Sequence, residues 1–375
     1  MRSAPRPERL RPALFVAAGA LLLAPLSGTL AEERVRVQGL FDAEVWKTDT
    51  GSTLLSKNEG DTAPEERLTL WVAAEITPGL QAFFLGQTIT GKAYGEGTYT
   101  EGQQAFLRYS FKTPLRLRME AGRITAPLGS FARRHFSSQN PLIGAPDTYD
   151  VSYPLGFQVE GSAKRFDYHA AVIDAPMINE KYSPEPGSLA RPALAAGVTP
   201  LTGLRFGAYT TWGPYLGPEV EPLLPAGAGW KDYGQKVVGF EVQFSRGYFE
   251  INNEFMLSRY EVPGRVRDSR GKAFYVEPKY TWTPRLFTAL RLERNDYPYI
   301  LPLGPGFWLG NTVGFYDLEA GVGYRLGPGT VIKAAYRRDR WHVDDSLKAI
   351  LPDGYSVSLQ LSHSFDVNSW IERPR

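Results

Sequence analysis

Apolar and polar side chains alternate with a period of two along most of the chain. Between Leu68 and Ile76, for example, every second residue is apolar. The same alternation occurs within 34–46, 115–121, 317–325 and 355–362. Because successive side chains of a strand point to opposite faces, this pattern predicts β-strands with one apolar and one polar face. Helical periodicity is nearly absent, so we expect an all-β protein.

The connections between the predicted strands are of two kinds, which follow each other in turn. Short ones are rich in Pro and Gly, as in 77–79 and 327–329, and this composition is typical of β-turns. Long polar ones lie between them, at 47–65, 90–102, 124–155, 174–190, 213–233, 261–271, 295–313 and 340–354. Eight long loops and seven short turns predict about sixteen strands. Such alternation is typical of a transmembrane barrel, with short periplasmic turns and long external loops.

Aromatic residues gather at the ends of the apolar faces, as expected where a barrel wall meets lipid headgroups. Those beside the short turns include Tyr109, Phe166, Tyr280, Trp282 and Tyr324, and those beside the long loops are Trp212, Tyr316 and Tyr355. A β-sandwich or propeller with ordinary core aromatics is the alternative. Since hydrocarbon offers no hydrogen-bond partner, the first strand must pair with the last one, at 355–367. We therefore predict a closed antiparallel transmembrane β-barrel.

The first 31 residues differ from the rest of the chain and indicate secretion. Four arginines precede the apolar stretch 13–26, and Thr29-Leu30-Ala31 supplies the small residues of a cleavage site. This arrangement is typical of a cleaved signal peptide at 1–31, which leaves 32–375 as the barrel and implies the bacterial outer membrane. A membrane anchor helix is the alternative, and the apolar stretch is short for one.

Composition and motifs disfavour several functions. The chain has no cysteine, and 42 Lys and Arg residues nearly balance 40 Asp and Glu residues. A cysteine-based metal or redox site is therefore excluded, and the basic excess of a nucleic-acid-binding protein is missing. We expect no metal, no cofactor and no enzyme. Ser162 and His169 are the nearest candidates for a nucleophile and its base, without the motifs of a barrel lipase or protease around them.

The parity that places aliphatic side chains toward lipid places many charged ones in the lumen. The candidate residues of the lumen wall are Arg36, Arg116, Arg118, Glu120, Lys279, Arg291, Glu293 and Arg337. Arginines in a row attract anions, and facing carboxylates cancel much of that field and leave a transverse one. Salt bridges that stiffen the wall are the other interpretation of these charges, so the sequence leaves the selectivity open.

The longest connection, 124–155, has an unusual composition for a loop in water. It combines Phe131, Phe136, Leu142 and Ile143 with charged residues. A loop folded into the lumen would pack these apolar side chains against the wall and direct its charges at the pore axis. The candidate residues of a pore constriction are Arg123, Arg133, Arg134, Asp147 and Asp150.

This part of the chain resembles Gram-negative outer-membrane porins, through Gly122-Arg123 at a strand end followed by Ala-Pro-Leu-Gly at 126–129. The stretches 274–280, 283–287 and 290–296 are similar to the phosphate-selective porin O and P group. The resemblance implies an inward-folded third loop, passive diffusion of ions and small hydrophilic solutes, and a homotrimer in contact with outer-membrane lipid and lipopolysaccharide. A transporter for a specific or hydrophobic substrate is the alternative. One departure is that the last strand does not end the chain on an aromatic residue.

Overall fold

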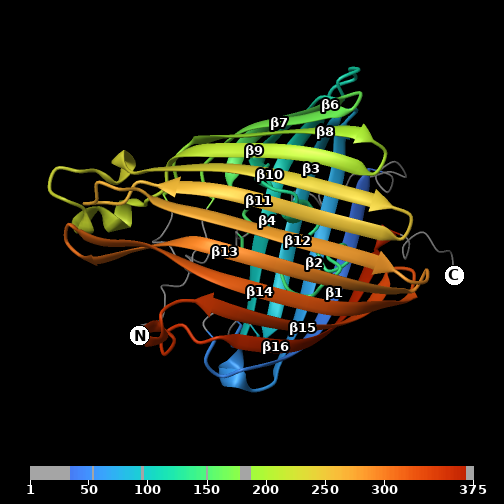
Figure 1. Ribbon diagram of the computed structural model, residues 1–375. Helices are drawn as coiled ribbons and strands as arrows, with labels where there is room; N and C mark the ends of the chain where they lie inside the picture. Colours follow the sequence, from blue (N-terminus) through green and yellow to red (C-terminus); the bar gives the residue numbers. More distant parts are fainter. Residues whose placement is uncertain (1–33, 53–54, 94–96, 149–150, 178–186, 369–375) are drawn as a thin grey trace.

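The protein is a single closed barrel in the computed structural model, which describes residues 34–52, 55–93, 97–148, 151–177 and 187–368. These residues form sixteen antiparallel strands, each paired with its neighbours in the chain, and the first strand pairs with the last (Figure 1). The predicted fold class and strand number are confirmed. The predicted signal peptide, 1–31, lies outside the described residues.

All strands except β5, with 6 residues, and β7, with 8 residues, reach the length of about nine residues that crossing a bilayer requires, and short 3-10 helices lie in the loops. The strands are β1 Val35–Thr48, β2 Ala63–Thr77, β3 Leu80–Gly91, β4 Gly97–Ser110, β5 Arg118–Arg123, β6 Leu155–Ala163, β7 Phe166–Ile173, β8 Arg191–Leu201, β9 Leu204–Pro214, β10 Gly234–Arg246, β11 Phe249–Tyr260, β12 Ser269–Thr281, β13 Leu286–Gly304, β14 Phe307–Gly327, β15 Thr330–His342 and β16 Gly354–Asp366. The helices are η1 Asn58–Gly60, η2 Phe131–Arg133, η3 Pro218–Leu223, η4 Trp230–Asp232 and η5 Asp345–Leu347. Within the described ranges, no helix has the length and apolar character needed to span a membrane.

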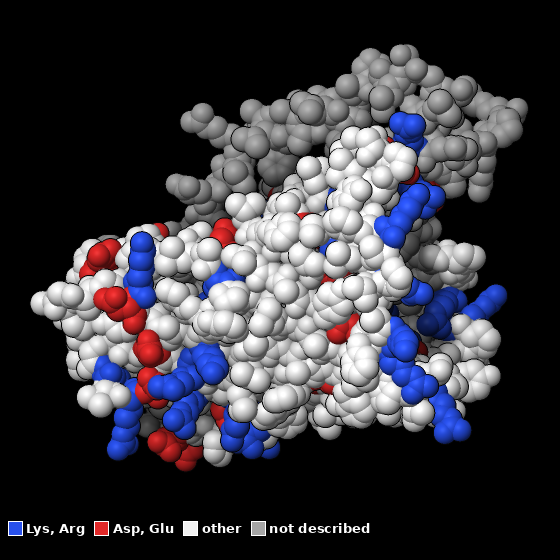
Figure 2. Space-filling model, turned by 90° about the horizontal axis from the view of Figure 1, so that it is seen from above, with Lys and Arg blue, Asp and Glu red and all other residues white. Residues whose placement is uncertain are grey.

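The two faces of the wall differ as the alternation predicts. On β1, Phe41 and Val45 are exposed on the outer face, whereas Asp42 and Glu44 are buried on the lumen face. The other strands repeat this division, so aliphatic side chains cover the outside. In Figure 2 a belt with few charged side chains separates two charged ends of the molecule. This outer surface is suited to hydrocarbon as its solvent.

Exposed aromatic side chains lie at both edges of this belt. Phe166, Tyr280 and Trp282 are close to the short turns, and Trp212 and Tyr355 are close to the long loops. Rows of this kind lie at headgroup level in transmembrane barrels.

The seam between β1 and β16 closes the barrel in an unbroken antiparallel register. The ring of Phe365 covers Gly39 directly across the seam. Beyond β16, the side chain of Asn368 accepts a hydrogen bond from the backbone N–H of Val37 and donates one to the carbonyl of Val35, both at 2.7 Å. No open strand edge therefore remains at this point of the sheet.

Two of the predicted long loops are wrong in extent, because their hairpins continue beyond the apolar belt. β13 and β14 remain paired as far as Gly304 and Phe307, so most of the predicted loop 295–313 is a two-stranded hairpin. β3 and β4 remain paired as far as Gly91 and Gly97, inside the predicted loop 90–102. The two strands of a hairpin satisfy each other's backbone hydrogen bonds, so the pairing continues beyond the membrane into water.

Arg116 was predicted on the lumen wall, and this placement is wrong. β5 begins only at Arg118, and Arg116 lies in the preceding turn with a φ of 45°. Its backbone N–H donates to the carbonyl of Thr113 at 3.1 Å. A left-handed residue in a turn interrupts the extended chain, so the two-residue alternation does not apply to it.

Candidate pore and its third loop

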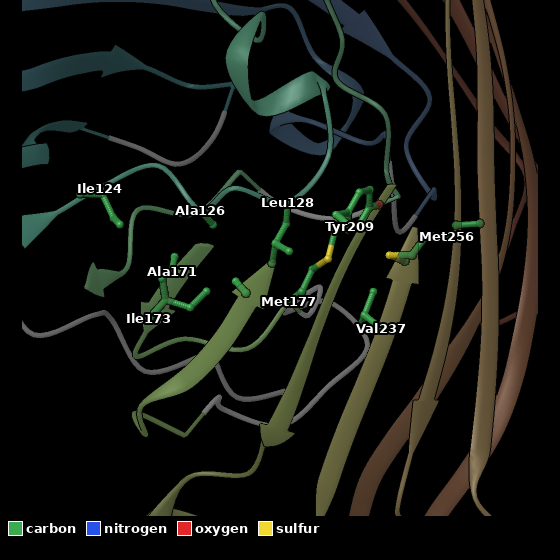
Figure 3. Packing of buried hydrophobic residues seen from close by; sticks show 11 residues of the cluster. Ile124, Ala126, Leu128, Ala171, Ile173, Met177, Tyr209, Val237 and Met256 are labelled. Atoms are coloured by element: carbon green, nitrogen blue, oxygen red, sulfur yellow. The ribbon is translucent and has the colours of Figure 1, made fainter. Parts of the chain in front are cut away.

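The third loop, L3, is the segment between β5 and β6, described at 124–148 and 151–154. Its first residues, Ile124, Ala126 and Leu128, pack in an apolar cluster against the lumen face of the wall (Figure 3). The wall residues of the cluster are Ala171, Ile173, Ala193, Tyr209, Val237, Met256 and Ala273, from β7 to β12, joined by Met177 after β7. Burial of these side chains is the hydrophobic part of the contact between L3 and the barrel.

The middle of L3 is bound by one buried lysine of β15. The Nζ atom of Lys333 donates to the carbonyl oxygens of Ser137 at 2.6 Å, Asn140 at 2.8 Å and Leu142 at 3.2 Å. An ammonium group has three donors, and here each has a partner from L3. These carbonyls have few partners within the loop itself, so the lysine satisfies buried groups that would otherwise be costly.

The backbone of Gly144 in L3 contacts two charged side chains of the wall. Its backbone N–H donates to Glu319 at 2.8 Å, and its carbonyl accepts from Arg291 at 2.9 Å. Arg291 and Glu319 are themselves paired at 2.9 Å across β13 and β14. A Cβ atom at position 144 would lie 2.7 Å from the Glu319 carboxylate, so a larger residue would displace this side chain from its partners.

The last part of L3 is bound by a second set of charges. Asp147 forms an ion pair with Arg337, whose Nε lies 2.6 Å from Asp317. Glu293 accepts hydrogen bonds from the backbone N–H of Asp147 and the hydroxyl of Thr148, both at 3.0 Å. Charge-assisted hydrogen bonds of this kind are among the stronger ones in proteins.

Arg134 has its side chain among aromatic and acidic groups of β12. It pairs with Glu277, donates to the hydroxyl of Tyr275 at 3.0 Å, and lies 5.0 Å from the ring centre of Phe131. Glu277 also binds Arg291 at 2.5 Å. The carboxylate therefore links a cation of L3 to a cation of the wall.

Three predicted wall residues lie on the lumen face but do not face water. Arg291 is 1% exposed, Glu293 is 3% exposed and Arg337 is 9% exposed. L3 covers all three through the contacts described above. The sequence allowed two interpretations of these charges, attraction of ions in the pore and salt bridges that stiffen the wall. For these three residues the structure shows the second.

Arg123 was predicted at the pore constriction, and the structure places it on the other side of the wall. It pairs with Ala105 and Leu155, and it shares the outer face with Leu155, which is 61% exposed. Its guanidinium donates to the carbonyls of Tyr153 at 2.9 Å and Gly102 at 2.8 Å. The prediction failed because Arg123 still belongs to β5, where alternation directs it outward.

Arg133 is the exposed arginine of L3. Its guanidinium lies 3.3 Å from Nε2 of His169 on β7, and Nδ1 of His169 lies 3.3 Å from Glu160 on β6. Glu160 also pairs with Arg118 at 3.3 Å. These four residues form a polar cluster between L3 and the wall of β5 to β7. Asp150, the last predicted residue of the constriction, lies outside the described residues.

The other predicted wall residues differ in exposure, and among them Glu120 is only 4% exposed. Arg36 is exposed and shares the lumen parity of Asp42 on β1. Lys279 pairs with Glu250 at 2.8 Å, and Glu120 pairs with Arg108 at 2.6 Å.

Ion pairs on β2 to β6 share one feature, which is that the cation is the more exposed partner. The exposed side-chain fractions are 22% for Arg67 and 1% for Glu65, 25% for Arg108 and 4% for Glu120, and 50% for Arg118 and 20% for Glu160. The carboxylates lie close to the wall and the guanidinium groups extend further from it. In these three pairs the group nearer to the water of the lumen is therefore the cation.

The candidate groups for catalysis are not arranged as a nucleophile and its base. Ser162 pairs with Asp167 in the register of β6 and β7, whereas His169 pairs with Glu160. Among the described residues, no group of three or more His, Asp and Glu side chains is placed to hold a metal ion.

Several L3 partners were not singled out from the sequence. Tyr275, Asn140 and Ser137 have no local pattern that distinguishes them from ordinary strand or loop residues. Their contacts with L3 or the wall depend on segments far apart in the chain, so a single sequence offers no signal for them.

Comparisons with solved structures show the fold of outer-membrane porins. An anion-selective porin from Comamonas acidovorans is 11% identical with a TM-score of 0.60, over 88% of this chain and 99% of that one. OmpF of Salmonella typhi, in complex with daunomycin, is 11% identical with a TM-score of 0.59, over 89% and 98%. The trimer form of OmpT, an outer-membrane protein of Vibrio cholerae, is 10% identical with a TM-score of 0.53, over 88% and 99%. No family model and no curated protein sequence matches the chain.

Proposed function

We propose that this protein is an outer-membrane porin through which small hydrophilic solutes diffuse passively, with a preference for anions. The anion preference rests on the ion pairs of β2 to β6, in which the arginine side chain is more exposed than its carboxylate partner. A surface that presents cations to water raises the local concentration of anions and lowers that of cations.

The arrangement of L3 supports the channel function. The loop is bound along β7 to β15 through an apolar cluster and through Lys333, Arg291 and Arg337. Its exposed charge, Arg133, is directed at the polar cluster on β6 and β7. We infer that solutes pass beside this cluster, along the arginines of β2 to β5.

The likeness to an anion-selective porin agrees with this proposal at the level of the fold. Selection for phosphate, as the resemblance to the porin O and P group implies, is a narrower form of the same proposal. A planar array of guanidinium groups suits phosphate because each binds two of its oxygens. We further propose a homotrimer in the outer membrane, exported through a signal peptide at 1–31.

Conductance across planar lipid bilayers tests the proposal. The mature chain, 32–375, is expected to give discrete ohmic steps, and a potassium chloride gradient is expected to give a reversal potential of the sign for anion preference. Absence of steps at any voltage contradicts the channel, and a cation-selective reversal potential contradicts the role of the guanidinium groups. Phosphate added to one side is expected to reduce chloride current if the narrower form holds.

A further inference from the structure

Two phenylalanine rings lie on the lumen face of the wall, where a water-filled pore favours polar side chains. Phe83 on β3 and Phe106 on β4 are directly paired in the register, and their rings stack with centres 5.0 Å apart and planes 18° apart. Phe106 packs against the apolar cluster that holds the first residues of L3, which places both rings inside the barrel. Both side chains are half-buried, so part of each ring is open to the pore.

Arg108 is held against these rings. Its guanidinium carbon lies 4.3 Å from the ring centre of Phe83 and 5.4 Å from that of Phe106, and its Nε donates to Glu120 at 2.6 Å. Within the described part of the chain, its two terminal amino groups have no hydrogen-bond partner. The ring contact and the ion pair thus fix the guanidinium group, and the amino groups are left to bind the two oxygens of a carboxylate.

A small residue and a second cation lie beside the rings. Ala73 on β2 pairs with Phe83 on one side and with Arg36 on the other. Arg36 is exposed, and the methyl group between it and Phe83 covers little of the wall. Glu75 is an exposed acid two residues further along β2, and its charge would repel an anion here.

Trp71 extends the aromatic surface toward the long loops. It lies two residues before Ala73 on the same face of β2, and its ring meets that of Phe136 in L3 edge to face, with centres 4.8 Å apart. Diagonal neighbours on paired strands are within reach of aromatic side chains, so Trp71 and Phe83 belong to one surface. The pore therefore has an aromatic surface from Trp71 to Phe106, with Arg108 at its short-turn end.

We propose that this surface is a binding site for small aromatic carboxylates, with the ring against the aromatic side chains and the carboxylate on the amino groups of Arg108. The inference rests on the proposed function and deepens it, because it names a class of anion that the pore concentrates. Chloride and phosphate can use Arg108 but gain nothing from the rings. An aromatic carboxylate gains from both, since aromatic pairs contribute beyond the area that they bury.

Saturation-transfer NMR on the refolded chain 32–375 in detergent tests the site, with benzoate as the probe and empty micelles as the background. Cyclohexanecarboxylate has the same charge without the aromatic ring, and benzamide has the ring without the charge. The wild type is expected to bind benzoate about fivefold more tightly than cyclohexanecarboxylate, as for one aromatic pair. It is expected to bind benzamide more weakly than benzoate. Equal affinity for benzoate and either of the other two probes would overturn the proposal.

Three variants test the separate parts of the site. Phe83→Leu is expected to remove most of the difference between benzoate and cyclohexanecarboxylate. Arg108→Lys keeps the charge and loses the planar pair of donors, so benzoate binding is expected to weaken about tenfold. Glu75→Gln is expected to strengthen benzoate binding and to leave benzamide binding as it is.

The matched control is Phe287→Leu. Phe287 on β13 also has cations over its ring, Lys279 at 5.5 Å and Arg325 at 5.0 Å, but it is only 4% exposed. Equal losses of benzoate preference in Phe287→Leu and Phe83→Leu would overturn the placement of the site. A wild type that binds benzoate but does not conduct contradicts the channel alone, and one that conducts chloride but binds the three probes equally contradicts this site alone.

Discussion

The side-chain nitrogen of Lys333 on β15 lies 2.6 Å from the carbonyl oxygen of Ser137 on L3, across 196 residues of the chain. The same nitrogen reaches two further carbonyls of L3, so that its hydrogen bonds all go to the loop. A buried ammonium is tolerated only when its donors are satisfied. The hydrogen bonds of Lys333 therefore hold L3 against the wall, and the carbonyls of L3 in turn stabilise the buried ammonium group.

Replacing Lys333 by methionine is expected to release the middle of L3. Three buried carbonyls lose their donor, at a cost of about 2–4 kcal/mol to the bound position of the loop. Trypsin cleavage after Arg133 or Arg134 is expected to accelerate, and single-channel records are expected to become noisier. Lys236→Met, on the exposed rim, is the control, and equal cleavage rates in the two variants would show that Lys333 does not hold the loop.

Reversing the charge of Arg133 is expected to lower the preference for anions. Two units of charge change at about 8 Å from a passing ion contribute roughly 1 kcal/mol in water, or about fivefold in relative permeability before screening by salt. The reversal potential in a salt gradient measures this change for Arg133→Glu. Arg267→Glu, in the exposed loop after β11, makes the same change of charge and is expected to have little effect.

The neighbouring substitution, Arg134→Glu, is expected to act differently. Arg134 pairs with Glu277 below the loop, so a glutamate there places two carboxylates together in a buried site. We expect lower thermal stability and faster cleavage of L3, with any change of selectivity following from displacement of the loop. If Arg134→Glu shifts the reversal potential with unchanged protease resistance, the two arginines have the same role and this distinction is wrong.

The barrel could be predicted because apolar and polar residues alternate along each strand, as expected where one face meets lipid and the other meets water. Phe41 and Asp42 differ in hydropathy for this reason, and the same contrast recurs around the wall. Closure also follows from the sequence, since an open edge cannot lie in hydrocarbon. The error at Arg123 was one of face, because the strand end was predicted correctly but the alternation of 115–121, continued to residue 123, directs that side chain outward.

The path of L3 was not predictable in the same way. Alternation places Arg291 and Arg337 in the lumen, but it cannot tell a lumen filled with water from one covered by a loop. What buries them is the approach of Gly144 to Glu319, between positions 175 residues apart. Such contacts depend on shape and on hydrogen-bond geometry, and neither leaves a periodic trace in one sequence.

The seam between β1 and β16 offers a test of barrel closure. Phe365 covers Gly39, and a side chain at position 39 would occupy the space of its ring. Gly39→Val and Phe365→Ala are both expected to destabilise the barrel, by about 1–3 kcal/mol for overpacking and by about 3–5 kcal/mol for the lost ring.

The temperature at which the folded band shifts to its unfolded position in gel electrophoresis measures this effect. Gly327→Val serves as the control for the glycine change, since a Cβ atom there meets nothing within 4 Å. A Gly39→Val barrel as heat-resistant as the control would show that Phe365 is not needed over the seam.

The last prediction concerns acid pH and His135, which lies in L3 outside the membrane-spanning strands. Its Nδ1 donates to the carbonyl of Ala132 at 2.7 Å, and its Nε2 accepts from the hydroxyl of Tyr153 at 2.9 Å. Burial lowers the pKa of His135 to about 4, and the positive charge of Arg67 acts in the same direction.

Because the pKa is lower in the bound loop than the ordinary value near 6.5, the neutral form favours the bound loop. Its contribution is complete above about pH 6.5 and is lost as the pH falls toward 4, by roughly 3 kcal/mol in total. We therefore expect cleavage of L3 by an acid-active protease to accelerate over this interval. His135→Gln has no charge to gain, so its cleavage rate is expected to change less with pH. An equal pH dependence in wild type and variant would assign the acid sensitivity to other groups of the loop or the wall.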